Sequence, residues 1–228
     1  MRTTKYACQV STGRRRGRLP SGDRQERERE VIAAALQELL SGGAAGLTMD
    51  RVARRAGASK ETLYAWFGGR DGLLARVVEA NADASAQSIR AALGVRTHTA
   101  DSARRHLTAY AQALLTLLTS PASIELNRAA MSSPQLAEQL RAGGRDRAGP
   151  LVEDYLRRLN AAGIIDVADP RDAFGVLFGL VVRDTQISVL LGGPRLDRAA
   201  LCRQADSAVE AFLQLYVPAR NRERDQAE

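Results

Sequence analysis

The sequence contains little cysteine and little histidine, and this shortage excludes several kinds of site. Its 228 residues include two cysteines, Cys8 and Cys202, and two histidines, His98 and His106. Two distant cysteines form no disulfide framework and lack the paired spacing of a zinc site. We therefore expect two free thiols in a reducing compartment, and we expect neither a metal ion nor a cofactor.

Long hydrophobic runs are also missing. The most apolar run, residues 173–182, is followed at once by Arg183 and Asp184. It is far shorter than the ~20 residues that a membrane-spanning helix needs. The basic residues near the N-terminus are not followed by the apolar stretch of a secretory signal. These absences predict a cytoplasmic protein.

Aromatic residues make up only 4% of the chain, whereas hydrophobic residues make up 45%, chiefly alanine and leucine. This mixture favours helices over sheets, and no segment alternates between apolar and polar residues as a strand would. The sequence therefore predicts an all-α fold. The expected helices cover residues 24–40, 48–56, 60–67, 71–92, 101–119, 121–131, 134–142, 146–162, 170–191 and 196–216.

The net charge of +7 is concentrated in the first third of the chain. Residues 1–70 contain fourteen basic and seven acidic residues, whereas residues 71–228 contain nineteen of each. A localised basic region is the electrostatic footprint of a protein that binds a polyanion such as nucleic acid. A solvated basic tail would also contribute to this excess.

Two short helices joined by a tight turn are predicted within residues 48–67. Thr48 and Ser59 can each cap the N–H groups of the helix that follows, and Gly57 stands where a helix end favours a left-handed residue. This is the pattern of a helix-turn-helix, whose second helix enters the major groove of DNA. An ordinary helical hairpin with a solvated face would give the same pattern.

The second of these helices has one apolar and one polar side. Leu63, Trp66 and Phe67 fall on the side expected to pack against the other helices, while Lys60 and Tyr64 face outward. A lysine can reach a guanine edge or a phosphate, and a hydroxyl suits a phosphate oxygen. The expected DNA contacts are Thr48, Ser59, Lys60, Thr62, Tyr64, Trp66 and Arg70.

Residues 47–67, LTMDRVARRAGASKETLYAWF, resemble the DNA-binding domain of the TetR family of regulators. The similarity continues through residues 70–74, and its most specific part is Thr-Leu-Tyr followed by Phe67, a basic residue three positions later and two leucines. The resemblance implies that Tyr64 and Arg70 hold backbone phosphates and that Lys60 reads a base. The family usually has lysine where Arg70 stands, and arginine keeps the charge.

The resemblance also implies an N-terminal DNA-binding head, a divergent helical body for ligand binding and dimerisation, and association with the nucleoid. We therefore divide the chain into a disordered basic arm (1–22), a helix-turn-helix domain (23–70), a regulatory and dimerisation domain (71–218) and a frayed tail (219–228). In the arm, the Arg-Gly-Arg sequence of Arg16 and Arg18 resembles a minor-groove hook. A solvated tail, or residues upstream of the true start, would look the same.

Residues 127–192 are similar to the C-terminal domain of AefR-like members of this family. Their apolar helix 170–191, with Gly175 and Gly179 four residues apart, is expected to form the homodimer interface together with residues 196–216. Two heads one DNA turn apart would read a palindromic operator. A small apolar ligand would bind between the body helices. The candidate ligand-binding residues are Tyr110, Leu114, Arg128, Met131, Tyr155, Phe174, Phe178 and Gln186, although such residues are more often core.

A repressor released by a small ligand is the function that these patterns favour. Two alternatives stay open: a DNA-binding regulator without an inducer, and a helical enzyme with His98 or His106 as its base. The sequence contains no nucleophile motif, metal spacing or phosphate loop that would support an enzyme.

Overall fold

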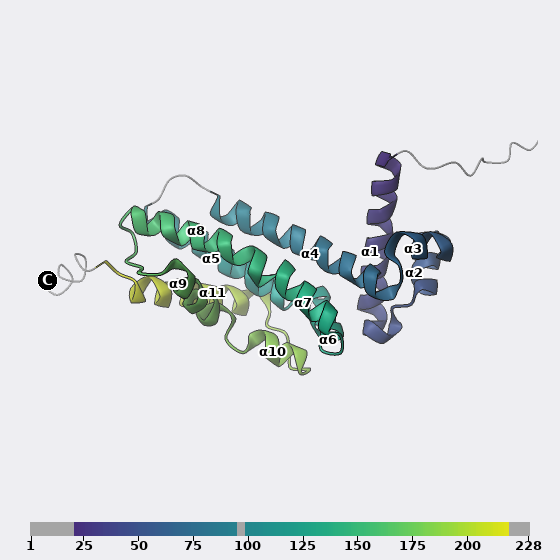
Figure 1. Cartoon of the computed structure of the whole chain (residues 1–228). Helices are drawn as coiled ribbons and strands as arrows, with labels where there is room; N and C mark the ends of the chain where they lie inside the picture. Colours follow the sequence, from purple (N-terminus) through teal and green to yellow (C-terminus); the bar gives the residue numbers. More distant parts are fainter. Residues whose placement is uncertain (1–20, 95–98, 219–228) are drawn as a thin grey trace, which may run out of the picture.

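In the computed structural model, which describes residues 21–94 and 99–218, every regular element is a helix. The all-α prediction is confirmed. Three helices form a head at one end of the molecule, and the remaining helices form an elongated body (Figure 1). The head comprises α1 (Ser21–Gly46), α2 (Met49–Ala56) and α3 (Lys60–Phe67). The body comprises α4 (Arg70–Leu93), α5 (Ala100–Leu118), α6 (Pro121–Ala130), α7 (Pro134–Gly143), α8 (Arg145–Ala161), α9 (Pro170–Val182), α10 (Thr185–Leu190) and α11 (Arg198–Leu215).

Side-chain caps fix where many of these helices begin. Thr99, Ser120, Ser133, Asp169 and Asp197 each accept a hydrogen bond from a backbone N–H of the helix that follows. The helices that start after Ser120, Ser133 and Asp169 have proline in the first turn, where a missing N–H costs nothing. These local signals explain why most predicted boundaries lie within two residues of the observed ones.

The first helix is longer than its sequence suggests. We expected it to end at residue 40, but the helix continues beyond that residue, is interrupted at Gly43, and resumes as far as Gly46. Gly43 has a φ of 63°, in the left-handed region that glycine adopts without strain. The glycine therefore interrupts the helix close to its predicted end, and the short segment after it returns to helical geometry.

The prediction of one continuous helix over residues 170–191 is wrong. Residues 170–191 form two helices, because the chain turns at Arg183, whose φ is 48°. Gln204 of α11 donates a hydrogen bond from Nε2 to the Val181 carbonyl at 2.8 Å and another to the Thr185 hydroxyl, also at 2.8 Å. A side chain from a distant helix thus satisfies a carbonyl group at the break, which the apolar periodicity of this segment does not reveal.

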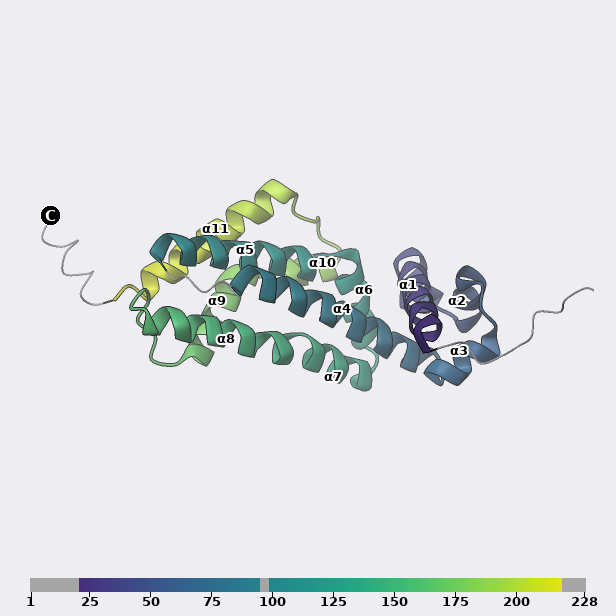
Figure 2. The ribbon, with the colours of Figure 1, turned by 90° about the horizontal axis from the view of Figure 1, so that it is seen from above.

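The body core is enclosed by five helices. Contacts run from α4 to α5, α5 to α11, α11 to α9, α9 to α8 and α8 back to α4, and Figure 2 shows α5 and α8 on opposite sides of α4. Large side chains from this ring, including Tyr155, Leu156 and Phe212, are fully buried in its centre. From α4, the body core includes Ile89 and Leu93, which lie near the C-terminal end of that helix.

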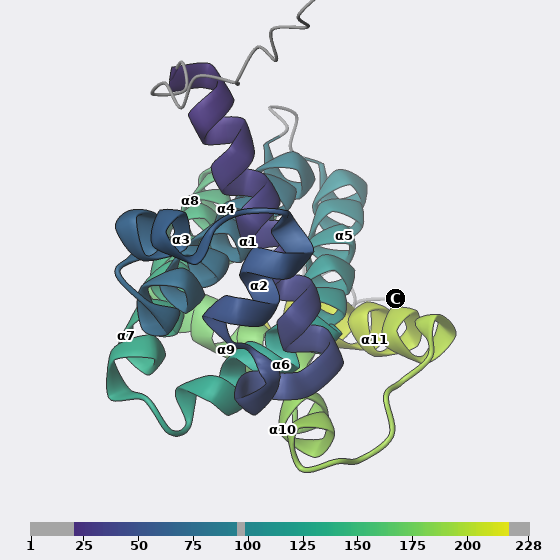
Figure 3. The same cartoon turned by 90° about the vertical axis from the view of Figure 1, so that its right-hand side faces the viewer.

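The head is not a separate globule. Its core cluster, centred on Val31, Leu39, Leu63 and Phe67, also contains residues from the body helices. These are Leu73, Leu74, Val77 and Val78 of α4, Leu126 and Ala129 of α6, and Leu136 of α7. Viewed from the head end, α6 lies directly behind the end of α1 (Figure 3), and the two helices are in contact. The head is thus anchored on α4, α6 and α7.

Candidate DNA-binding surface and ligand cavity

Local hydrogen bonds fix the start of α2 and the turn between α2 and α3. The Thr48 hydroxyl accepts from the Arg51 N–H at 3.3 Å, and the Ser59 hydroxyl accepts from the Thr62 N–H at 3.2 Å. Gly57 ends α2 with φ 59° and ψ 36°, the left-handed conformation that the sequence led us to expect. Thr48 and Ser59 are both exposed, so their hydroxyls cap helices at the surface where DNA contacts were predicted.

Helix α3 presents its polar side to solvent. Leu63 and Phe67 are buried in the head core, whereas Lys60 is exposed and the Tyr64 side chain is 52% exposed. Trp66 is half-buried: its ring packs edge-on against Phe67, with the centroids 6.3 Å apart, and the Arg24 guanidinium lies 5.7 Å from its ring centroid. Trp66 therefore joins α3 to the start of α1.

Lys60 is held in place by an acidic residue of the preceding helix. Its Nζ forms an ion pair with the Asp50 carboxylate. The hydrogen bond to Asp50 raises the pKa of Lys60 above its ordinary value, so the amine stays protonated at neutral pH. A base or phosphate that takes this ammonium group must compete with Asp50.

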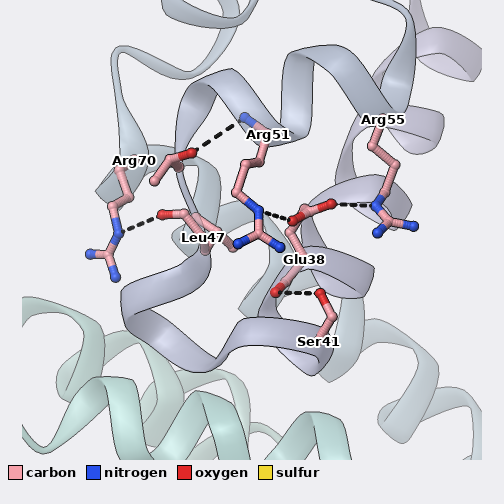
Figure 4. A network of polar contacts seen from close by, with 7 residues as sticks. Glu38, Ser41, Leu47, Arg51, Arg55 and Arg70 are labelled. Atoms are coloured by element: carbon pink, nitrogen blue, oxygen red, sulfur yellow. Dashed lines mark hydrogen bonds and ion pairs between the residues drawn. The ribbon is translucent and has the colours of Figure 1, made fainter.

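A buried carboxylate fastens α1 to α2, and the sequence analysis did not identify it. Glu38 is 4% exposed, and its two carboxylate oxygens accept hydrogen bonds from Arg51 Nε at 2.6 Å and Arg55 Nε at 2.5 Å (Figure 4). The hydrogen bond from Arg55, together with Arg51, lowers the pKa of Glu38 despite the opposing effect of burial. The sequence feature that could have identified Glu38 is its position as a lone glutamate within the apolar stripe of residues 31–40.

Arg70 lies where the head meets α4. Its Nε donates to the Leu47 carbonyl at 3.1 Å, and its Nη2 donates to the Ala44 carbonyl at 2.5 Å. The residue as a whole remains exposed, next to the N-terminus of α4. The other two predicted DNA contacts, Arg16 and Arg18, lie outside the described residues.

A largely apolar cavity in the body has a volume of about 430 Å³ and lies between α4, α5, α6, α7, α8, α9 and α10. Six of the eight candidate ligand-binding residues line it: Tyr110, Leu114, Met131, Phe174, Phe178 and Gln186. The structure also adds polar residues that the sequence analysis did not name: Asn81, Ser85, Ser123, Asn127, Arg141 and Arg145. These residues occupy ordinary polar positions of amphipathic helices, so only the packing shows that they face a cavity.

The other two candidates lie elsewhere. Tyr155 is fully buried in the body core, and its hydroxyl lies 3.1 Å from Nδ1 of His106, the residue considered as a catalytic base. Arg128 pairs with Glu125 at 2.6 Å and donates to the Leu190 carbonyl at 3.2 Å. Tyr155 therefore packs in the core, and Arg128 joins α6 to α10.

The described part of the chain contains neither a cluster of metal ligands nor a helix suited to a membrane. Within residues 21–94 and 99–218, no group of three potential metal ligands gathers. In the same ranges, no helix combines the length and the apolar character needed to cross a membrane.

The head and body together define a helix-turn-helix DNA-binding protein with a helical regulatory body. Residues 31–77 match the family described as bacterial regulatory proteins, tetR family, and residues 105–218 match the AefR-like transcriptional repressor, C-terminal domain. The chain belongs to the TetR family of transcriptional regulators. The resemblance inferred from residues 47–74 is confirmed, as is the similarity of the C-terminal body to AefR-like members.

Solved structures agree with this assignment. A crystal structure described as a TetR transcriptional regulator from Agrobacterium tumefaciens is 32% identical, has a TM-score of 0.71, and covers 85% of this chain and 95% of its own. Another, described as a TetR-family regulator from Mesorhizobium loti MAFF303099, is 28% identical with a TM-score of 0.75, covering 85% and 98%. The flavonoid-responsive regulator FrrA shares the fold at 24% identity, with a TM-score of 0.63 and coverage of 86% and 99%. Among curated proteins, none matches significantly by sequence.

Proposed function

We propose that the protein is a homodimeric repressor that binds a palindromic operator and is released by a small, mainly apolar ligand. The main support for this proposal is that neighbouring residues of α6 belong to the cavity and to the head core. Asn127 lines the cavity, whereas Leu126 and Ala129 pack in the head core. A ligand that shifts α6 would therefore shift the packing beneath the head.

The DNA-reading role is assigned to residues 23–70 and the regulatory role to residues 71–218. In this assignment Lys60 reads a base, while Tyr64 and Arg70 hold phosphates. The exposed side of α3 supports the proposal, since a recognition helix must leave its polar face free for the major groove. Thr48, Ser59, Thr62 and Trp66 complete the proposed contact surface, with Arg16 and Arg18 of the N-terminal arm as minor-groove contacts.

The dimer interface is assigned to residues 170–216. A methyl group added at Gly175 or Gly179 would meet no atom within 4 Å, so this side of α9 is open in the single chain. Val176, Ile187 and Leu191 are large apolar side chains exposed on the same stretch. Apolar residues beside small ones allow a second helix to approach closely, which supports a helix-packed interface between two copies.

Induction would work through two helices rather than one. The first connection is α4, whose residue Val78 borders both the head core and the cavity. Helix α6 provides a second connection. A ligand that favours the arrangement unable to bind DNA must itself be weakened by DNA to the same degree.

The test begins with the selection of bound DNA from a random library and a binding curve over a range of salt concentrations. Hydrophobic small molecules are then screened by thermal shift, and each hit is titrated against the protein–operator complex. We expect hits to weaken operator binding by about tenfold or more, which requires about 1.4 kcal/mol of coupling. The variant Ser85→Phe, which places a ring in the cavity, should bind the operator normally and lose the response.

Three results would decide against parts of this proposal. A ligand that stabilises the protein yet leaves operator affinity unchanged at saturation would argue against induction through α4 and α6. A broad screen without hits would favour a regulator that has no inducer. Failure to select any DNA sequence would refute the DNA-reading role itself.

A further inference from the structure

The cavity has a positively charged group at its rim. Arg145, the first residue of α8, is exposed, and its guanidinium carbon lies 4.9 Å from the Phe178 ring centroid and 5.6 Å from that of Phe174. Both phenylalanines line the cavity, as does Arg145. Stacking on two rings orients the guanidinium against the apolar wall while its N–H groups remain available to a ligand.

The arginines near Arg145 form ion pairs with the nearby carboxylates. Arg141 forms an ion pair with Asp146, and Arg147 pairs with Asp83 at 2.5 Å. Within the described ranges, Arg145 forms no ion pair with a carboxylate and no hydrogen bond. A positive charge that borders an apolar cavity without a counterion favours an anion at that position.

A second polar group in the cavity wall lacks a partner. Tyr110 of α5 lines the cavity and is 1% exposed, yet its hydroxyl forms no hydrogen bond with any residue that the structure describes. Buried hydroxyls are almost always hydrogen-bonded, and the equally buried Tyr155 bonds to His106. Burial raises the pKa of Tyr110, an effect that the positive charge of Arg145 opposes. The hydroxyl therefore remains protonated and can donate a hydrogen bond.

The backbone beside Arg145 adds to this environment. Gly143, Gly144 and Ala148 line the cavity where α8 begins, and no side chain caps the N-terminus of this helix. Uncapped N–H groups at a helix N-terminus favour negative charge. Asp146, the acidic residue of this first turn, is engaged by Arg141.

We infer that the ligand is an amphiphilic organic acid, with an apolar body inside the cavity and one anionic group held by Arg145 and the Tyr110 hydroxyl. The inference rests on the proposed function and specifies the chemical class of its ligand. The apolar side chains of α4, α5 and α9 contact the body of the molecule. The anionic group lies at the start of α8, where it supplies the counterion for Arg145 and the acceptor for Tyr110.

The experiment compares two fluorescent probes that share one skeleton. 8-Anilinonaphthalene-1-sulfonate carries an anionic group, and N-phenyl-1-naphthylamine is its uncharged counterpart. We expect the full-length protein to bind both and each probe to displace the other. Arg145→Gln should weaken the sulfonate by about tenfold, the loss of about 1.4 kcal/mol, and leave the neutral probe unchanged. Tyr110→Phe should act in the same direction with a smaller effect.

Arg147→Gln is the matched control, because Arg147 lies two residues further along α8, does not line the cavity and is paired with Asp83. It should leave the affinities of both probes unchanged. Thermal denaturation and operator binding of every variant establish that the fold is retained. The variant Arg145→Lys keeps the charge without the planar stacking group, and it should recover part of the sulfonate affinity.

The possible results separate the inference from the proposed function. If Arg145→Gln weakens both probes equally, or neither, the anionic subsite is refuted while the cavity remains a ligand site. If the neutral probe binds and the sulfonate does not, the ligand class is wrong. If neither probe binds, the cavity is refuted as a ligand site. Operator binding, measured without any probe, tests the DNA-binding function independently of all these outcomes.

Discussion

The Arg70 guanidinium donates a hydrogen bond to the carbonyl of Leu47, the residue immediately before the N-cap of α2, with Nε and the oxygen 3.1 Å apart. A second bond from the same side chain reaches the Ala44 carbonyl. The first residue of α4 is thereby tied to the chain that enters the helix-turn-helix. A lysine, with a single ammonium group on a flexible stem, would not reproduce this forked geometry, which gives arginine a structural role here.

Replacing Arg70 should therefore affect both stability and DNA binding. We expect Arg70→Ala to lower the free energy of unfolding by about 1–2 kcal/mol through loss of two charge-assisted hydrogen bonds, and to weaken binding to all DNA sequences. The slope of the logarithm of the binding constant against the logarithm of the salt concentration should become shallower by about one unit, because one phosphate contact is lost. Arg70→Lys should keep the salt dependence and lose part of the stability. Unchanged affinity and salt dependence in Arg70→Ala would rule out the phosphate contact.

Glu38 should make the head sensitive to acid. Its pKa is lower in the folded protein than the ordinary value of 4.5, so its ionised form stabilises the fold above that pH. This contribution is lost as the pH falls below 4.5 and through the lower folded pKa. Glu38→Gln should lower the melting temperature by several degrees at neutral pH, with a smaller difference from the wild type in acid.

The control for this prediction is Glu138→Gln, since Glu138 is exposed on α7 and forms no ion pair with any described residue. Melting curves recorded from neutral to acidic pH would test both variants. A difference between wild type and Glu38→Gln that stays constant over the whole range would show that the charge of Glu38 does not contribute.

Lys60 and Tyr64 should have distinguishable effects on DNA recognition. Lys60→Ala should change the sequence selected from a random library, because a base contact discriminates by about 1–3 kcal/mol. Tyr64→Phe should weaken all sequences alike, since a hydroxyl-to-phosphate contact carries no direct sequence information. A uniform loss of affinity in Lys60→Ala, with an unchanged selected sequence, would place Lys60 among the phosphate contacts instead.

A charge on the open side of α9 should disrupt the dimer. Gly179→Arg would place an unpaired charge within the proposed interface, at a cost of several kcal/mol. Sedimentation analysis should then show monomers, or the protein should become insoluble. Ala65→Arg, on the exposed side of α3, should remain dimeric. A soluble Gly179→Arg dimer of native stability would place the interface elsewhere.

The sequence predicted the helices and the DNA-binding helix-turn-helix because their determinants are local. The caps Thr48 and Ser59 and the left-handed Gly57 act within a few residues of their positions. The break at Arg183 was missed because Gln204, nineteen residues or more away, provides the hydrogen bonds that stabilise it. The partners of Glu38 and the cavity position of Arg145 depend in the same way on packing between distant segments.

Helix α6 contacts more parts of the molecule than its ten residues suggest. It packs against α1, α7 and α10, its residue Asn127 lines the cavity, and Arg128 bonds to the end of α10. The walls formed by α5 and α9 can change during evolution to accommodate another ligand without disturbing the head. A substitution in α6 can affect its contacts with the head, with the cavity and with α10, so selection acts on it through all three. Across orthologues whose ligands differ, α4 and α6, which both join the cavity to the head core, should therefore vary least among the body helices.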